Sequence, residues 1–322
     1  MRTFTSVPGL SPDARPSETG AVGRRVRHAS RQRCNPTREL ERVARGLTCG
    51  FVAAEADREP PIGVAGFGVR RRTRRCLRSA PVIAGDSRPL LLGHRGAPRD
   101  ALENTLAAFA AARDQGADGV ELDVHRSADG ALVVHHDAVV EGFGLLAGHT
   151  GAEIREARPS IPTLGEVFDL CTGMLVNVEV KNSPHDADFD PQDRAADAVV
   201  ELVQSRELYD SVLVSSFHLP TIDRVRALDP RIATGYLVVV DPLPLAALEI
   251  AHDHGHRALH PHLAALGEAF APAVVTRAQE LGLALNVWTV NDPEEIIRLA
   301  QLGIDAIITD TPRIARDALA RA

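Results

Sequence analysis

From residue 89 to the end of the chain, short apolar runs alternate with segments whose apolar residues recur every three to four positions. The runs are rich in Val, Leu and Ile, which is typical of strands buried on both faces of a parallel sheet. Eight strands are predicted, over residues 89–94, 119–124, 175–180, 212–216, 234–239, 258–260, 284–289 and 305–309. Helices are predicted between them, over residues 104–115, 163–171, 192–206, 219–228, 243–254, 271–281 and 292–301.

This alternation predicts an α/β fold with a parallel sheet covered by helices. Eight strand–helix units close naturally into a (β/α)₈ TIM barrel, and about 235 residues is close to the usual length of such a domain. An open, doubly wound sheet is the alternative arrangement of the same elements.

One segment interrupts the alternation after the second predicted strand. Asp129-Gly130 separates the β-patterned runs ELDVHRS and ALVVHHD, and this dipeptide strongly favours a hairpin turn. We therefore expect a short hairpin insertion that carries His135 and His136 back towards the mouth of the barrel.

The first part of the chain differs in composition. Residues 1–88 contain 18 Arg and 8 acidic residues, a formal balance of +10, whereas residues 89–322 contain 18 basic and 35 acidic residues, a balance of −17. We expect residues 1–85 to be a disordered, Arg-rich extension and residues 86–322 to be the barrel domain. The extension could be a basic arm, a transit peptide or the product of an upstream translation start. An acidic barrel argues against nucleic-acid binding, which requires basic surface.

No stretch resembles a membrane span of about 20 apolar residues, and the early sequence lacks the apolar run of a signal peptide. Only Cys171 of the four cysteines lies in the predicted barrel, so an internal disulfide is not expected there. These features predict a cytoplasmic protein without stable membrane insertion.

Polar side chains stand at the ends of the first three predicted strands, where a TIM barrel places its reactive groups. The second strand carries Glu121 and Asp123, which share a face because side chains alternate along a strand, and the third carries Glu179. Buried carboxylates repel one another unless a cation lies among them. Three oxygen ligands without cysteine favour Mg²⁺ or Ca²⁺ over zinc. A salt-bridge network with Arg is the alternative.

Three further residues suit phosphate chemistry. His94 and His136 have the side chain best suited to acid–base catalysis near neutral pH. Lys181 is the only lysine beside 35 arginines, and a compact ammonium close to Glu179 suggests a phosphate contact.

By contrast, the run AHDHGH at residues 251–256 has a spacing that does not favour a shared metal site among its histidines. His260 and His262 follow it and could line the mouth.

Several strings that occur in order across the barrel resemble the glycerophosphodiester phosphodiesterase family. They are HRG (94–96), ENT (103–105), GADGVELDVHRSADGALVVHHD (116–137), IPTL (161–164), NVEVK (177–181), SSF (215–217), NVWTVND (286–292) and GIDAIITDTP (303–312). The resemblance implies a TIM barrel that hydrolyses glycerophosphodiesters to sn-glycerol 3-phosphate and an alcohol, by two-histidine acid–base catalysis with a divalent cation. It covers none of residues 1–85.

Carried over to this sequence, the resemblance makes His94 and His136 the acid–base pair. It implies that Glu121, Asp123 and Glu179 hold the cation, that Arg95 and Lys181 contact phosphate, and that Phe217 and Trp288 wall the substrate site. We assign His94 as base and His136 as acid.

The segment after His136 departs from the family pattern and is short, which leaves the accepted alcohol open. Phospholipase D-like cleavage of lysophospholipids and a non-catalytic glycerophosphodiester-binding module are the alternative functions.

Overall fold

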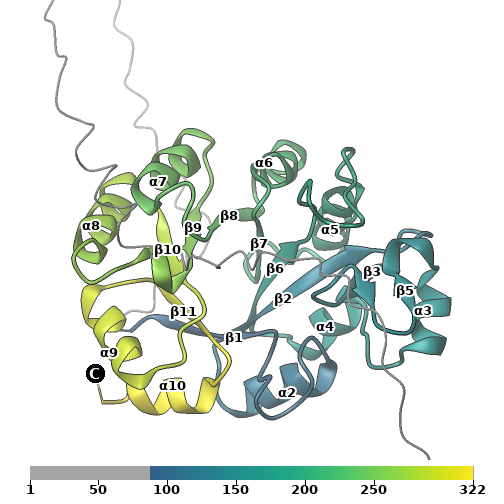
Figure 1. The fold of residues 1–322 in the computed structure, drawn as a ribbon, viewed down its shortest axis with the longest axis horizontal. Helices are drawn as coiled ribbons and strands as arrows, with labels where there is room; N and C mark the ends of the chain where they lie inside the picture. The colour runs from purple at the N-terminus through teal and green to yellow at the C-terminus, as the bar shows by residue number, and fades with distance from the viewer. Residues whose placement is uncertain (1–87, 322) are drawn as a thin grey trace, which may run out of the picture. The chain divides into compact units, whose positions relative to one another are not determined.

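Eight parallel strands form a closed ring in the computed structural model, which describes residues 88–321 (Figure 1). The strands are β1 (Leu90–His94), β2 (Gly119–Arg126), β6 (Leu175–Val180), β7 (Val212–Ser216), β8 (Ala233–Val238), β9 (Ala258–Pro261), β10 (Ala284–Val287) and β11 (Ala306–Thr309). Strand β1 pairs with both β11 and β2, so the ring has no open edge. The predicted TIM barrel is confirmed, and the doubly wound alternative is wrong. The extension predicted over residues 1–85 lies outside the described residues.

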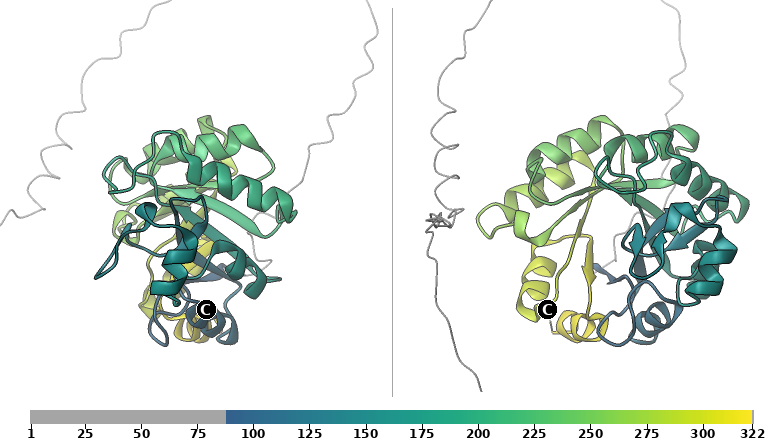
Figure 2. Two further views of the ribbon diagram at one scale, coloured as in Figure 1. Left: turned by 90° about the vertical axis from the view of Figure 1, so that its right-hand side faces the viewer. Right: turned by 45° about the vertical axis from the view of Figure 1, so that its right-hand side comes forward.

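Each barrel strand is followed by a helix that packs outside the ring (Figure 2). The helices are α2 (Leu106–Asp114), α4 (Leu164–Leu170), α5 (Arg194–Ser205), α6 (Leu219–Leu228), α7 (Pro244–Asp253), α8 (Ala271–Leu281), α9 (Pro293–Leu302) and α10 (Pro312–Leu319). Proline occupies the first turn of α6 to α10, where its missing N–H costs no intrahelical hydrogen bond. None of the helices in residues 88–321 is long and apolar enough to cross a membrane.

The hairpin insertion follows β2 as predicted. Strand β2 continues to Arg126 and pairs antiparallel with β3 (Leu132–Val134), and Gly130 turns the chain with a φ of +93°. The rest of the insertion contains β4 (Val139–Val140), β5 (Gly144–Leu145), the 3₁₀ helix η1 (Leu146–Gly148) and α3 (Gly151–Ala157), while the 3₁₀ helix η2 (Leu263–Ala265) follows β9. The hairpin fixes His136 beside the end of β2, because the His135 N–H donates to the Asp123 carbonyl at 3.1 Å.

Because side chains alternate along a strand, the apolar and the reactive residues of β2 lie on opposite faces of the barrel wall. On β2, Val120, Leu122 and Val124 face outward into an apolar cluster shared with helices. Glu121 and Asp123 therefore face the barrel interior. The lower interior is filled by small and branched apolar side chains, namely Leu92, Leu213, Ala258, Ala284, Ala306 and Ile308. The carboxylates thus stand above an apolar floor at the carboxyl end of the barrel.

Two expectations about the later strands need correction. Strand β10 ends at Val287, two residues before the predicted end, although Trp288 still bridges to His262 and its indole donates from Nε1 to the His260 carbonyl at 2.8 Å. His260 does not line the mouth, since its side chain is fully buried and its Nε2 lies 3.0 Å from Asn286 Nδ2. Gly235 makes room for this imidazole, because a Cβ there would lie 2.4 Å from His260 Nε2.

Candidate active site

Three carboxylates from two adjacent strands converge at the carboxyl end of the barrel. Strands β2 and β6 pair in a register that sets Asp123 opposite Glu179, and Glu121 faces the same interior two residues earlier. One oxygen from each of the three carboxylates lies within 4.8 Å of the others, and all three residues are buried. The structure therefore brings the predicted ligand set together.

Two basic side chains compensate part of this negative charge. Lys181 Nζ lies 2.9 Å from Asp123 Oδ1 and 2.6 Å from Glu179 Oε1. Arg95 Nε lies 3.3 Å from Asp123 Oδ2, to which Asn104 Nδ2 also donates at 2.8 Å. Although burial works against ionisation, the charges of Lys181 and Arg95 lower the pKa of Asp123. The salt-bridge alternative thus accounts for Asp123, and the phosphate contacts of Arg95 and Lys181 remain a prediction.

Glu121 has no comparable partner. Its Oε2 accepts the backbone N–H of Arg95 at 3.1 Å, and no basic side chain in residues 88–321 forms an ion pair with it. Burial, followed by the charge of Asp123, raises the pKa of Glu121 to about 8. A divalent cation would favour the ionised form, and three oxygen donors at this spacing suit a hard ion such as Mg²⁺ or Ca²⁺. The residues therefore fit the expected metal.

His94 ends β1 and is oriented by a carboxylate from the other end of the chain. Its Nδ1 lies 2.7 Å from Asp310 Oδ1, and Asp310 Oδ2 accepts from Asn291 Nδ2 at 2.7 Å. Burial opposes the charged imidazole, but the Asp310 hydrogen bond and the Glu121 charge raise the pKa of His94 overall. An imidazole held through Nδ1 presents Nε2 for proton transfer.

His136 follows the hairpin strand β3 and lines the same cavity as Glu121 and Glu179. Its Nδ1 lies 2.7 Å from the exposed Asp137 Oδ1. Its carbonyl lies 3.2 Å from Nε2 of the buried His125, whose Nδ1 lies 2.7 Å from Asp188 Oδ2. Burial and the charges of Lys181 and Arg95 lower the pKa of His136, although Asp123 opposes them. The two histidines thus have pKa values shifted in opposite directions.

A cavity of about 200 Å³ joins these groups. Eight of the nine predicted site residues line it, namely His94, Arg95, Glu121, His136, Glu179, Lys181, Phe217 and Trp288. The ninth, Asp123, is buried at 1% exposure behind Lys181 and Arg95. Phe217 and Trp288 meet edge to face with ring centroids 5.5 Å apart, which forms an aromatic wall. Chemically, the cavity offers a cation site, two proton-transfer groups and an apolar side.

Known proteins resemble this chain in sequence and in fold. The model of the glycerophosphoryl diester phosphodiesterase family matches residues 94–314, which include every site residue described above. The chain belongs to this family. A glycerophosphodiester phosphodiesterase of Caldanaerobacter subterraneus subsp. tengcongensis is 32% identical over 243 residues, which span 69% of this chain and 94% of that protein. The chain is accordingly a phosphoric diester hydrolase.

Solved structures of the family share the fold. A glycerophosphodiester phosphodiesterase of Thermotoga maritima superposes with a TM-score of 0.61 at 32% identity, covering 71% of this chain and 97% of that one. An Oleispira antarctica phosphodiesterase, solved in complex with the product sn-glycerol-3-phosphate, superposes with a TM-score of 0.63 at 28% identity, covering 72% and 97%.

Sequence reasoning missed several residues of this phosphodiesterase site. Asp310 and Asn104 both fall inside strings that carried the family resemblance, but their partners His94 and Asp123 are 216 and 19 positions away. Asn104 also adopts a left-handed φ of 56°, which Asn tolerates better than most residues. Asn177 lines the cavity with both amide atoms unpaired within the described chain, so it is available to a ligand. The strand parity of Asn177 and Glu179 was the signal that could have identified it.

Proposed function

We propose that this chain hydrolyses glycerophosphodiesters to sn-glycerol 3-phosphate and an alcohol, with a divalent cation bound by Glu121, Asp123 and Glu179. The observation that carries the proposal is the convergence of three buried carboxylates and two histidines on one cavity. The product complex of the Oleispira antarctica relative supports the choice of product.

The site would bind a phosphodiester through charge. A bound Mg²⁺ or Ca²⁺ would stabilise the negative charge that grows on the phosphoryl oxygens. Arg95 and Lys181 line the same cavity and would add a guanidinium and an ammonium on the protein side. Phe217 and Trp288 would contact the apolar edge of the glycerol or of the leaving group. This local positive centre offsets the acidic character of residues 89–322.

The two histidines would divide the proton transfers. Asp310 holds His94 through Nδ1, which suits His94 to accept a proton from the nucleophile at Nε2. The nucleophile is a water or the glycerol hydroxyl next to phosphorus, which would give a cyclic phosphate first. His136 would protonate the departing alkoxide. The raised pKa of His94 makes it the stronger base, and the lowered pKa of His136 makes it the stronger acid.

Leaving-group dependence tests this assignment. With glycerophosphocholine, His94→Ala and His136→Ala should each lower kcat by about 10²–10⁴-fold. With a glycerophosphodiester of p-nitrophenol, whose leaving group needs little protonation, His136→Ala should recover most of its rate while His94→Ala stays slow. Recovery of His94→Ala instead would reverse the two roles, and near-normal turnover by both variants would remove them from the mechanism.

Product analysis tests the substrate class. Phosphorus NMR of a reaction with glycerophosphocholine should show sn-glycerol 3-phosphate, with or without a cyclic intermediate. A parallel reaction with detergent-solubilised lysophosphatidylcholine measures the phospholipase D-like alternative. Faster turnover of the lysolipid would favour that alternative, and binding of glycerophosphocholine without product in the presence of metal would favour a binding module.

A further inference from the structure

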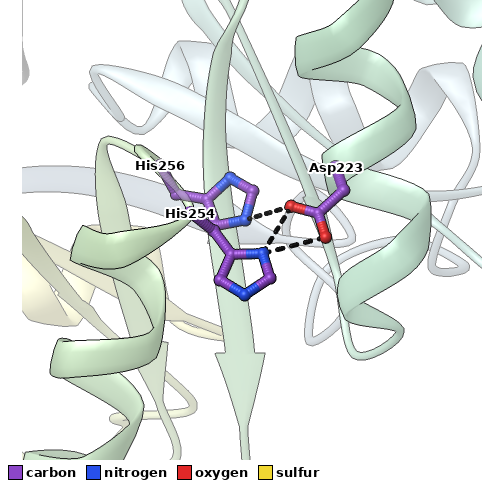
Figure 3. Close-up of side chains that lie close together, drawn as sticks. All are labelled: Asp223, His254 and His256. Atoms are coloured by element: carbon purple, nitrogen blue, oxygen red, sulfur yellow. Dashed lines mark hydrogen bonds and ion pairs between the residues drawn. The ribbon is translucent and has the colours of Figure 1, made fainter.

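A second group of potential metal ligands lies apart from the active site, and Figure 3 shows its three side chains close together. It comprises Asp223 of α6, His254 at the end of α7 and His256 in the loop before β9. One donor atom from each lies within 4.8 Å of the others. The sequence spacing did not favour a shared site among the histidines of this segment, and the structure places two of them, His254 and His256, beside a carboxylate that α6 supplies.

His256 is held in a fixed orientation within this cluster. Its side chain has 0% exposure, and its Nδ1 lies 2.9 Å from the hydroxyl of Thr234 on β8. Its Nε2 has no hydrogen-bond partner within the described residues, although Asp223 Oδ1 is only 3.2 Å away. Figure 3 shows this nitrogen facing the carboxylate beside the ring of His254. An imidazole fixed through one nitrogen, with the other presented to neighbouring donors, is the usual arrangement of a histidine metal ligand.

The other two members are accessible from solvent. His254 Nδ1 lies 2.9 Å from both oxygens of Asp223, and the two side chains are 40% and 37% exposed. The two imidazole rings stack with centroids 6.0 Å apart. An ion pair between His254 and Asp223 would satisfy these two groups without a metal, whereas His256 Nε2 contacts Asp223 Oδ1 at 3.2 Å without forming a hydrogen bond. Arg226 also lies close, against Gly255, and its charge opposes a cation at this site.

We propose that Asp223, His254 and His256 form a second metal site, specific for a transition-metal ion such as Zn²⁺. Two imidazoles and one carboxylate suit zinc, whereas the all-oxygen set of the active site suits Mg²⁺ or Ca²⁺. The exposed side of the cluster leaves the fourth position to water.

The place of this site in the fold indicates its role. His256 precedes the first residue of β9, and Thr234 is the second residue of β8, so the cluster lies at the amino ends of the strands. The active site lies at their carboxyl ends. A metal here would tie α6 to the segment joining α7 and β9, and it would stabilise the barrel without taking part in catalysis.

Zinc binding by tag-free protein tests the proposal. Metal-free Glu121→Gln protein, in which the active-site ligand set is impaired, should bind one equivalent of Zn²⁺ in equilibrium dialysis against ZnCl₂ with a competing chelator. Adding His254→Ala should weaken this binding by about 100-fold or more, since loss of a ligand exceeds the usual effect of losing a supporting hydrogen bond. Zinc at about 100 times its Kd should raise Tm by roughly 5–10 °C, and His254→Ala should abolish that rise.

His252 provides the matched control. It is an exposed histidine in the last turn of α7, two residues before His254, and is not part of the cluster. His252→Ala should keep both the stoichiometry and the rise in Tm. Because His254 is exposed, its replacement should leave the fold intact, which circular dichroism would check. Equal zinc affinity in the His252→Ala and His254→Ala variants, or no zinc bound in the Glu121→Gln background, would overturn the proposal.

Discussion

At the scale of single residues, the active site is organised by unequal compensation of buried charge. Asp123 is paired with Lys181 and Arg95, whereas Glu121 receives a backbone N–H and no basic side chain from residues 88–321. A buried carboxylate without a counter-charge favours its protonated form, and a bound cation would favour the ionised form instead. Strand parity predicted that the carboxylates would be buried together. It could not predict which one would lack a partner, because the pairing depends on side-chain reach.

Glu121 should make the metal-free protein less stable as the pH rises. Its pKa is raised from 4.5 to about 8 in the folded state, so between these values the folded protein retains a proton that the unfolded chain has released. The free energy of unfolding therefore falls across this window. At pH 8, Glu121→Gln should raise it by on the order of 2 kcal/mol in urea titrations with EDTA.

The exposed Glu201→Gln on α5 is the control and should change stability by less than about 0.5 kcal/mol. Excess Mg²⁺ or Ca²⁺ at pH 8 should stabilise the wild-type protein more than Glu121→Gln. If the free energy of unfolding depended equally on pH in the wild type and in Glu121→Gln, Glu121 would not be the group that causes the loss of stability.

The catalytic contribution and the pKa of His94 should depend on Asp310 more than those of His136 depend on Asp137. Both aspartates contact the Nδ1 of a histidine at 2.7 Å, but Asp137 is 70% exposed and its ion pair is screened by water. Asp310→Asn should lower kcat by about tenfold or more and shift the His94 limb of the pH–rate profile to lower pH, because the charge that raises its pKa is removed. Asp137→Asn should change both by much less. A similar response in the two variants would contradict the positioning role of Asp310.

At the scale of elements, apolar periodicity predicted the eight barrel strands and the helices between them. It missed α3 and α10. The buried positions of α10 are Pro312, Ala315 and Ala318, whose small side chains give little contrast with the polar face, and α3 buries only Ile154. The Asp129-Gly130 signal succeeded because a turn of this kind is determined locally.

The stability of the protein should be sensitive to substitution at the turn of the hairpin that positions His136. Gly130 has a φ of +93°, which an L side chain rarely adopts, and an added Cβ would lie 2.9 Å from Arg126 Nη2. Gly130→Ala should therefore lower the free energy of unfolding by about 1 kcal/mol in urea titrations.

Gly148→Ala, in the adjoining η1, is the control, because it lacks a positive φ and a Cβ there meets nothing within 4 Å. It should be neutral within about 0.5 kcal/mol. Equal stability of the two variants would show that the turn conformation contributes little.

At the scale of the whole molecule, the barrel brings together residues that no local pattern connects. His94 and Asp310 are 216 positions apart, and they meet because β1 and β11 are neighbours in the closed ring. The second metal site arises in the same way, since Asp223 lies 31 positions before His254. Ring closure was predicted from the count of strands, but contacts across the seam require the register, which sequence spacing does not define.

The acidic charge of the barrel limits where an anionic substrate can bind. A chain with a balance of −17 over residues 89–322 binds an anionic phosphodiester only where local charge is reversed. The measurement that tests this most directly is turnover of glycerophosphocholine to sn-glycerol 3-phosphate before and after exhaustive EDTA treatment, followed by addition of Mg²⁺ or Ca²⁺. We predict that chelation abolishes turnover and that one of these ions restores it in the wild type but not in Glu121→Gln. Undiminished turnover after complete metal removal would contradict a cation among Glu121, Asp123 and Glu179.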